Sequence, residues 1–372
     1  MKNIKAEKNN EIKKIGIIGD GHFAEALAYL ISKVNKDVEI VLWAYEEGKE
    51  RDGKNGDTFQ YSKREGKEMP LPENVRITHN AQHVVVNSEV LFSVLPAQYT
   101  REAYEGVFKD LIEVNWDNIK AIISGTKGIE KETNQLISEV LQSVFDSTGR
   151  KVLEKMGVIS GLTFSEDIIN DRPVGANIVS ESEDVQKIGL DLLKQEGEFD
   201  VLPQKGVRSA EIFGALKNVI AIATGAAEGL KYEGDAIEEL IAAGVSEINR
   251  FATALEIDHK SLGKNDYTML DLVGTAKSFK SRNFQTGFSY TNREEAKDMG
   301  VSEGVETVKS VIALAKEKNI KMPICEAVYE MFGNKKDISQ ILESLLKKLE
   351  VLKRASQIKV VRDRKKKKKK ED

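Results

Sequence analysis

Cysteine is almost missing from this sequence: Cys325 is the only one among 372 residues. A single cysteine excludes an internal disulfide framework. Histidine is scarce as well, and no His and Cys residues cluster with the spacing of a metal site. No apolar run approaches the length of a membrane span, and the polar start MKNIKAEKNNEIKK lacks the apolar core of a signal peptide. We therefore expect a cytoplasmic protein with no metal and no membrane insertion.

The chain also lacks a strong net charge, but its small value of −4 hides an asymmetry. Residues 353–372 carry 11 basic and 3 acidic side chains, which leaves 45 basic and 57 acidic ones for the rest. The chain outside the tail is acidic and does not indicate a basic surface for nucleic acid, so we expect no nucleic-acid partner. The like-charge block in the tail predicts disorder, with contact to RNA or a membrane as the alternative.

What the chain does have is a composition typical of a globular protein, with 40% hydrophobic and 31% charged residues. In its first part, β-branched apolar runs alternate with stretches of helical periodicity, which predicts βαβ units and a mostly parallel sheet. The polar piece 46–72 interrupts this pattern and is expected to be an exposed insertion. The predicted strands are KKIGIIG, DVEIVLW, EVLFSVLP, IKAIISG, GVIS and GANIVS, and the helices between them include FAEALAYLISKVN, TNQLISEVLQSVF and VQKIGLDLLKQ.

Strand signals fade after about residue 203, and the later segments read as helices. They include GVRSAEIFGALKNVIAIATGAAEGL, AIEELIAAGVSEINRFATALEI, VETVKSVIALAKEK, ICEAVYEMF and ISQILESLLKKLEVLK. The change from α/β to all-α marks a predicted domain boundary. We expect a polar N-terminal extension over 1–13, a dinucleotide-binding domain over 14–203, a helical substrate-binding domain over 204–352 and a basic tail over 353–372.

A glycine-rich turn joins the first strand to the first helix. Gly19, Gly21 and Ala24 form the pattern G-x-G-x-x-A, in which the glycines allow a tight turn and close approach of a pyrophosphate. The following helix N-terminus adds free N–H groups and a positive dipole end. The alternative is an ordinary glycine turn. After the second strand, Glu46 and Glu47 favour the free ribose hydroxyl of NAD, and NADP stays possible.

The most unusual polar group is Lys217, which lies in the middle of the apolar segment EIFGALKNVIAIATG. A helix that is apolar on all sides is buried, and burial lowers the pKa of a lysine into the range of a proton donor and acceptor. The alternative is a side chain that reaches out to solvent. Lys127 follows a strand in a glycine-flanked loop, Asp271 lies between two leucines, and Arg282 follows soon after. Read alone, these three are also explained as a surface lysine, a capping acid and a solvated charge.

Taken in order, several segments resemble the NAD(P)-dependent glycerol-3-phosphate dehydrogenase family: GDGHFAEA, VLWAYEE, GTKGIE, SGLTF, GALKNVIAIATG, DLVGT, SRN, EGV and KMPICEAVYEMF. The resemblance extends over residues 14–350. It implies an α/β fold, in which a Rossmann-type doubly wound sheet domain is followed by an all-α C-terminal domain. The implied reaction is reversible hydride transfer between nicotinamide and dihydroxyacetone phosphate, giving sn-glycerol 3-phosphate for glycerophospholipid synthesis. The implied assembly is a homodimer.

The resemblance also implies roles for individual residues. Lys217 would protonate the carbonyl oxygen, Lys127 would polarise the same oxygen and touch cofactor, and Asp271 would orient Lys217 or the substrate hydroxyl. The implied substrate-binding residues are Gly161, Thr163, Asn218, Thr275, Ser281, Arg282 and Asn283, of which Thr275, Ser281, Arg282 and Asn283 hold the phosphate. The implied cofactor-binding residues are Gly19, Gly21, His22, Phe23, Ala24, Tyr45, Pro96, Lys127, Ser165, Arg282 and Glu303.

Two other functions stay open at this point. One is another two-domain dehydrogenase that acts on a hydroxy acid or a sugar acid, because an arginine binds carboxylate as well as phosphate. The other is a non-catalytic dinucleotide sensor that holds an anionic partner with its basic tail. A sensor has no use for a buried proton donor, which argues against the second alternative.

Overall fold

The computed structural model describes residues 12–48, 50–59, 69–232, 234–258, 267–291, 302–333 and 337–352. Within these residues the chain forms two compact units. Unit 1 contains the chain up to Lys127, residues Gln135–Glu211 and the short piece 267–270. Unit 2 contains Gly128–Asn134, residues 212–258 and the described chain from Asp271 onward. The predicted domain limits 14–203 and 204–352 stay predictions, as do the extension 1–13 and the tail, which lies outside the described residues.

Unit 1 is built on a nine-stranded sheet with the order β3-β4-β2-β1-β5-β6-β7-β8-β9. Neighbouring strands are parallel except at the pairs β3–β4 and β7–β8. The strands are β1 (Lys14–Ile18), β2 (Glu39–Trp43), β3 (Arg51–Asp52), β4 (Val75–Thr78), β5 (Val90–Ser93), β6 (Ala121–Ser124), β7 (Met156–Leu162), β8 (Val174–Val179) and β9 (Phe199–Gln204).

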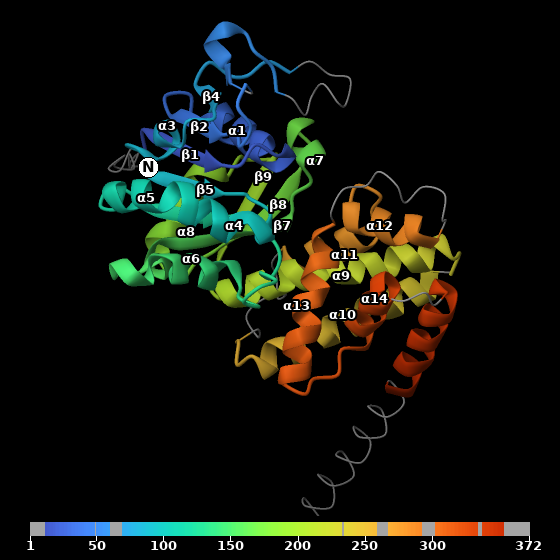
Figure 1. The fold of residues 1–372 in the computed structure, drawn as a ribbon. Helices are drawn as coiled ribbons and strands as arrows, with labels where there is room; N and C mark the ends of the chain where they lie inside the picture. Colours follow the sequence, from blue (N-terminus) through green and yellow to red (C-terminus); the bar gives the residue numbers. More distant parts are fainter. Residues whose placement is uncertain are drawn as a thin grey trace, which may run out of the picture. The chain divides into compact units, whose positions relative to one another are not determined.

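Helices cover both faces of this sheet (Figure 1). One core packs α1, α7 and α8 against the sheet, and the other packs α3, α4, α5 and α6 against the opposite face. Most strands are therefore buried on both sides and have the continuous apolar runs seen in the sequence. The helices are α1 (His22–Val34), α3 (Ala81–Val85), α4 (Ala97–Ala103), α5 (Lys109–Asn115), α6 (Ile137–Phe145), α7 (Ser165–Ile169) and α8 (Glu183–Leu193).

The order of the strands reverses at β1. This strand pairs with β2 on one side and with β5 on the other, both in parallel. Such a reversal is the point at which open α/β sheets bind ligands, beyond the carboxyl ends of the strands. The predicted Rossmann-type doubly wound sheet is confirmed.

The expectation of an exposed insertion over 46–72 is wrong for part of that segment. Arg51–Asp52 adds strand β3 to the sheet edge, and Phe59 and Leu71 are buried in the core beneath it. The Arg51 guanidinium pairs with the buried Glu25 carboxylate at 2.9 Å. The two apolar side chains and this ion pair fasten the segment to unit 1. Residues 49 and 60–68 lie outside the described part of the chain.

Unit 2 is helical, which confirms the predicted all-α C-terminal part. Its helices gather around α9, in yellow-green (Figure 1). Helix α9 is long and apolar enough to span a membrane by length and composition, but its most apolar window is 100% buried inside the protein, as in a core helix. The helices are α9 (Val207–Gly229), α10 (Gly234–Ala254), α11 (Thr268–Ala276), α12 (Arg282–Thr291), α13 (Glu303–Glu317), α14 (Pro323–Gly333) and a last one over 338–352. The first turn of α9 and the first three residues of α11 belong to unit 1.

Candidate active site

The glycine-rich turn of unit 1 has the conformation that the sequence pattern requires. Gly19 has φ +132°, a value that side chains rarely adopt, and a Cβ there would lie 3.1 Å from the carbonyl oxygen of Val94. Gly21 is the N-cap of α1 and provides no side-chain cap, and a Cβ built on it meets nothing within 4 Å. The first N–H groups of α1 therefore face a turn with room for a phosphate group.

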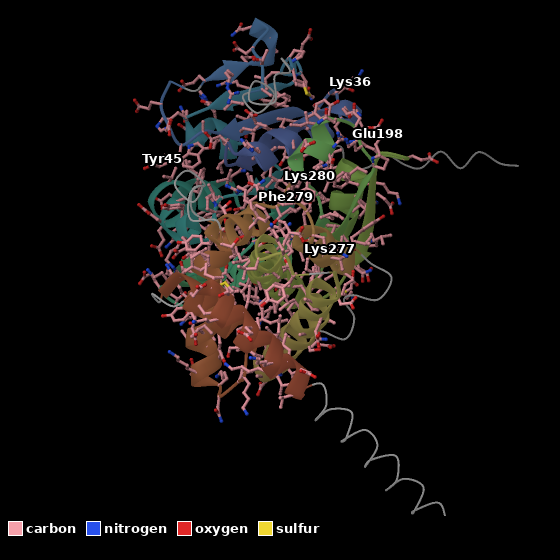
Figure 2. The ribbon with its side chains drawn as sticks, turned by 90° about the vertical axis from the view of Figure 1, so that its right-hand side faces the viewer. Lys36, Tyr45, Glu198, Lys277, Phe279 and Lys280 are labelled. Carbon is pink, nitrogen blue, oxygen red and sulfur yellow. The ribbon has the colours of Figure 1, made fainter. Side chains whose placement is uncertain are left out.

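Other candidate residues of unit 1 follow the carboxyl ends of parallel strands. Tyr45 follows β2 and is 73% exposed, and it projects from the surface (Figure 2). Pro96 follows β5 and begins α4, and Lys127 follows β6. Because β1, β2, β5 and β6 run in parallel, these ends lie at one edge of the sheet.

The end of β6 is packed closely against the glycine-rich turn. A Cβ on Gly125 would lie 2.8 Å from Cε1 of Phe23, in the first turn of α1. Phe23 therefore lies against the loop that carries Lys127, a half-buried side chain at which the first segment of unit 1 ends. His22 and Ala24 are the neighbours of Phe23 in the same helical turn.

The end of β7 carries three further candidates. Gly161 lies inside β7, where a Cβ would come 2.5 Å from the carbonyl oxygen of Gly175 on β8. This close approach gives Gly161 a structural reason to be glycine. Thr163 follows the strand and donates its main-chain N–H to the Gly161 carbonyl at 3.0 Å. Ser165 begins α7.

Unit 2 contains a buried cluster of charged and polar groups around Lys217. This residue lies on α9 and is 5% exposed, as the sequence predicted, and Asp271 on α11 is 2% exposed. The Lys217 ammonium donates a hydrogen bond to Oδ1 of Asp271 and another, at 3.2 Å, to Oγ1 of Thr275. Thr275 donates to the same carboxylate oxygen at 3.3 Å. Buried charges need such partners, and here they fix the position of the ammonium group.

A second polar cluster of unit 2 lies at the start of α13. Asn218 donates from Nδ2 to Oε2 of Glu303 at 3.5 Å. Asn283 accepts at Oδ1 from the hydroxyl of Ser302 and, at 2.9 Å, from the main-chain N–H of Gly304. A Cβ on Gly304 would lie 2.8 Å from Oδ1 of Asn283 and 2.9 Å from the Asn218 carbonyl oxygen. The start of α13 is thus held tightly against α9 and α12.

The start of α12 carries the candidate anion-binding arginine. Ser281 is buried and its Oγ accepts the main-chain N–H of Phe284 at 3.3 Å, so it caps the helix. Arg282 is the first residue of α12 and is exposed. A guanidinium beside a helix N-terminus combines a planar fork of donors with the positive end of the helix dipole, a combination that suits phosphate.

The structure therefore brings the candidates together in two sets, one in each unit. Sequence reasoning missed Ser302, which fixes the Asn283 amide, although it directly precedes the quoted segment EGV. It also missed the Arg51–Glu25 pair, because no local pattern connects the two residues. Among the described residues, no group of three or more His, Cys, Asp and Glu side chains gathers to hold a metal ion.

Two of the buried acids outside these sets have a raised pKa. Burial raises the pKa of Glu211 and of Glu247 to about 7. Glu211 accepts the main-chain N–H of Ser138 at 2.7 Å, in the first turn of α6. Glu247 accepts the main-chain N–H of Ile324 at 2.6 Å, in the first turn of α14. Both carboxyl groups hold the start of a helix, which gives each of them a structural role.

Comparison with known proteins shows the family to which the chain belongs. A family model described as NAD-dependent glycerol-3-phosphate dehydrogenase N-terminus matches residues 14–186, and the corresponding C-terminus model matches residues 206–343. A glycerol-3-phosphate dehydrogenase [NAD(P)+] from Staphylococcus epidermidis is 30% identical over 354 residues, covering 91% of this chain and 98% of the relative. One from Desulfotalea psychrophila is 29% identical over 343 residues, covering 91% and 98%.

The fold has a counterpart among solved structures. The glycerol-3-phosphate dehydrogenase of Coxiella burnetii superposes with a TM-score of 0.73 at 24% identity, covering 90% of this chain and 99% of that one. Both family models, and relatives matched over nearly their whole length, agree with the resemblance seen in the sequence. The chain belongs to the NAD-dependent glycerol-3-phosphate dehydrogenase family.

Proposed function

We propose that this protein catalyses the reversible reduction of dihydroxyacetone phosphate to sn-glycerol 3-phosphate with NAD(H) or NADP(H). Family membership supports the reaction and the cofactor. The structural observation that carries the proposal is the buried cluster of Lys217, Asp271 and Thr275. A proton donor held in a dry environment suits a reaction in which negative charge develops on a carbonyl oxygen.

In this reaction the bound nicotinamide supplies a hydride to the carbonyl carbon, and the carbonyl oxygen takes up a proton. We assign the proton to the ammonium of Lys217, which accepts it back in the reverse direction. Asp271 and Thr275 position the ammonium through the hydrogen bonds described above. Lys127 is proposed to polarise the same oxygen. Its position after β6, at the edge of the sheet where the glycine-rich turn lies, supports this role.

The phosphate of the substrate is assigned to the start of α12. Arg282 supplies the guanidinium, and Ser281, Asn283 and Thr275 supply neutral polar groups. The exposed position of Arg282 at a helix N-terminus supports this assignment. The remaining substrate contacts are proposed for Gly161, Thr163 and Asn218.

The cofactor is assigned to the edge of the sheet at which β1 ends. The φ of Gly19 and the uncapped start of α1 fit a pyrophosphate. The proposed cofactor contacts are Gly19, Gly21, His22, Phe23, Ala24, Tyr45, Pro96, Lys127, Ser165, Arg282 and Glu303.

The proposal is tested by following the absorbance of reduced nicotinamide after addition of dihydroxyacetone phosphate. NADH and NADPH are compared at equal concentration, and pyruvate and a keto sugar acid replace the substrate as controls. Among the three substrates, we expect turnover only with dihydroxyacetone phosphate. The ratio of its rates with NADH and with NADPH gives the cofactor preference. Cofactor binding without turnover on any substrate would contradict the proposal and favour a dinucleotide sensor.

Three finer points are proposals as well. We propose a homodimer in the cytoplasm whose product supplies glycerophospholipid synthesis. Light scattering coupled to size-exclusion chromatography distinguishes a dimer from a monomer of 41.4 kDa. Cell fractionation tests the compartment, and depletion of the protein followed by measurement of glycerol 3-phosphate tests the supply.

A further inference from the structure

The turn that leads into the proposed phosphate site contains an exposed aromatic side chain. It spans Lys277–Ser281, between α11 and α12, and Phe279 at its centre is 52% exposed. Lys277, Phe279 and Lys280 can be followed on the near side of the molecule (Figure 2). About half of the Phe279 surface stays in solvent, so the side chain is not part of the buried core.

The ring of Phe279 lies against two other aromatic rings, both on α12. Its centroid is 5.0 Å from that of Phe284 at an interplanar angle of 80°, and 5.1 Å from that of Phe288 at 77°. Both are edge-to-face arrangements, which aromatic rings prefer. Because Phe284 and Phe288 are one helical turn apart, the Phe279 side chain packs along the side of α12.

The main chain of the turn is fastened to the same helix. The Nε2 group of Gln285 donates to the carbonyl oxygen of Phe279. The turn is closed by the main-chain N–H of Ser281, which donates to the carbonyl oxygen of Ser278 at 2.9 Å. Side chain and main chain of Phe279 therefore both hold the turn on α12.

The turn leads directly into the start of α12. Ser281 caps the helix and Arg282 is its first residue, so both move if the turn moves. A binding group held in place before the ligand arrives loses less conformational freedom on binding. We propose that Phe279 is a positioning residue for the substrate phosphate: it holds the turn on α12, so that Arg282 and the first N–H groups of α12 form one preformed site. This inference rests on the proposed function.

The test compares Phe279→Ala with a matched control on α12, the helix against which Phe279 packs. Tyr290 lies near the other end of α12, is 39% exposed, and its ring lies 4.5 Å from that of Phe332. Tyr290→Ala therefore also removes a half-exposed aromatic pair, but far along the helix from Arg282. Phe279→Tyr keeps the ring and serves as the conservative variant.

We expect Phe279→Ala to raise the KM for dihydroxyacetone phosphate about threefold to tenfold, because the change removes the contacts of one or two aromatic pairs. The kcat and the KM for reduced nicotinamide stay within about twofold of the parent values. Phe279→Tyr restores the KM, and Tyr290→Ala leaves it unchanged. An unchanged KM in Phe279→Ala, or an equal rise in Tyr290→Ala, would overturn the proposal.

A second measurement separates this inference from the proposed function. Inorganic phosphate raises the Tm of a protein that binds it. We expect a smaller rise for Phe279→Ala than for the parent protein and for Tyr290→Ala. If the parent protein does not reduce dihydroxyacetone phosphate, the proposed function fails, but the role of Phe279 in anion binding is still decided by these Tm shifts. Equal shifts in all three proteins would refute it.

Discussion

At the scale of single residues, the central feature is an ion pair that is buried at both ends. Counted for the side chains alone, Lys217 and Asp271 are 7% and 3% exposed. Replacing such a pair by apolar groups often costs little stability, whereas removing one partner is strongly destabilising. Stability alone therefore gives little reason to keep this pair. A proton donor in a fixed position gives a functional reason, and the two reasons can be separated by experiment.

The separation uses Lys217→Met alone and together with Asp271→Asn. The single change leaves a buried carboxylate without its cation, and we expect a loss of about 3–5 kcal/mol in the free energy of unfolding. The double change removes the charge, so most of that loss is recovered. Both variants lose turnover, by about 100-fold or more, because neither has the proton donor.

Urea unfolding and single-turnover rates measure the two effects independently. Lys316→Ala, an exposed lysine on α13, is the control and retains stability and turnover. Recovery of turnover in the stable double variant would remove Lys217 from the chemistry.

Arg282 is the second residue whose role is decided by one side chain. A hydrogen bond to a charged group contributes about 1.5–3 kcal/mol, so Arg282→Ala is expected to raise the KM for the phosphate substrate about tenfold to hundredfold. Arg282→Lys keeps the charge but loses the fork of donors, so its KM lies between that of the parent protein and that of Arg282→Ala. Steady-state kinetics measures both. Arg208→Ala, which removes an exposed partner of Glu139, leaves the KM unchanged. A KM for Arg282→Ala equal to that of the parent would exclude the arginine from the phosphate site.

At the scale of secondary-structure elements, the start of α14 is held by a buried acid. Glu247 accepts the main-chain N–H groups of Ile324 and Cys325 at 2.6 and 3.3 Å. Burial raises its pKa from 4.5 to about 7, although these hydrogen bonds lower it. The folded state therefore keeps the proton in a range of pH where the unfolded chain has already lost it.

The sign of the pH dependence follows from this shift. The contribution of protonated Glu247 is complete below pH 4.5 and is lost as the pH rises through about 7, a change of about 3 kcal/mol. Glu247→Gln does not titrate. We expect the variant to gain stability relative to the parent protein between pH 5 and pH 8, as measured by urea unfolding. Glu317→Gln, an exposed acid on α13, shows no such trend. A difference between parent and Glu247→Gln that does not change with pH would contradict the shifted pKa.

Local patterns predicted the strongly periodic elements and missed those that depend on tertiary packing. The apolar runs around β1, β2, β5 and β6, the periodicity of α1 and the long apolar segment of α9 were enough to predict these elements and the fold class. Helix α12 was not predicted, because RNFQTGFSYT contains Gly287 and few strong helix formers. It forms against α9, where a Cβ on Gly287 would lie 2.0 Å from the carbonyl oxygen of Ile222. Such a close approach of two helices leaves no local signal.

The same limit applies to the site. The glycine-rich turn and the buried Lys217 could be found from the sequence because each is an anomaly within a short segment. The pairing of Lys217 with Asp271 joins residues 54 positions apart, and only packing shows it. Strand β4, with Arg76 between apolar residues, was missed for a related reason: it is short and lies next to the sheet edge, where the pattern is weak.

At the scale of the whole molecule, the distribution of charge makes a prediction about the tail. Without residues 353–372 the chain has 45 basic and 57 acidic side chains, so its net charge is −12. Such a body does not attract an anionic substrate, and binding must depend on local donors such as Arg282 and Lys127. The tail, with a charge of +8, lies outside the described residues.

If local donors suffice, removal of residues 353–372 leaves kcat, KM and Tm unchanged at physiological ionic strength, where charges act over about 8 Å. Steady-state kinetics and thermal unfolding of the truncated chain measure this. At low ionic strength the more negative body repels the substrate over longer distances, so a modest rise in KM there, abolished by salt, agrees with the same argument. A loss of kcat that salt does not restore would mean that the tail contributes to the working enzyme by direct contact, and the acidic body alone would no longer account for the activity.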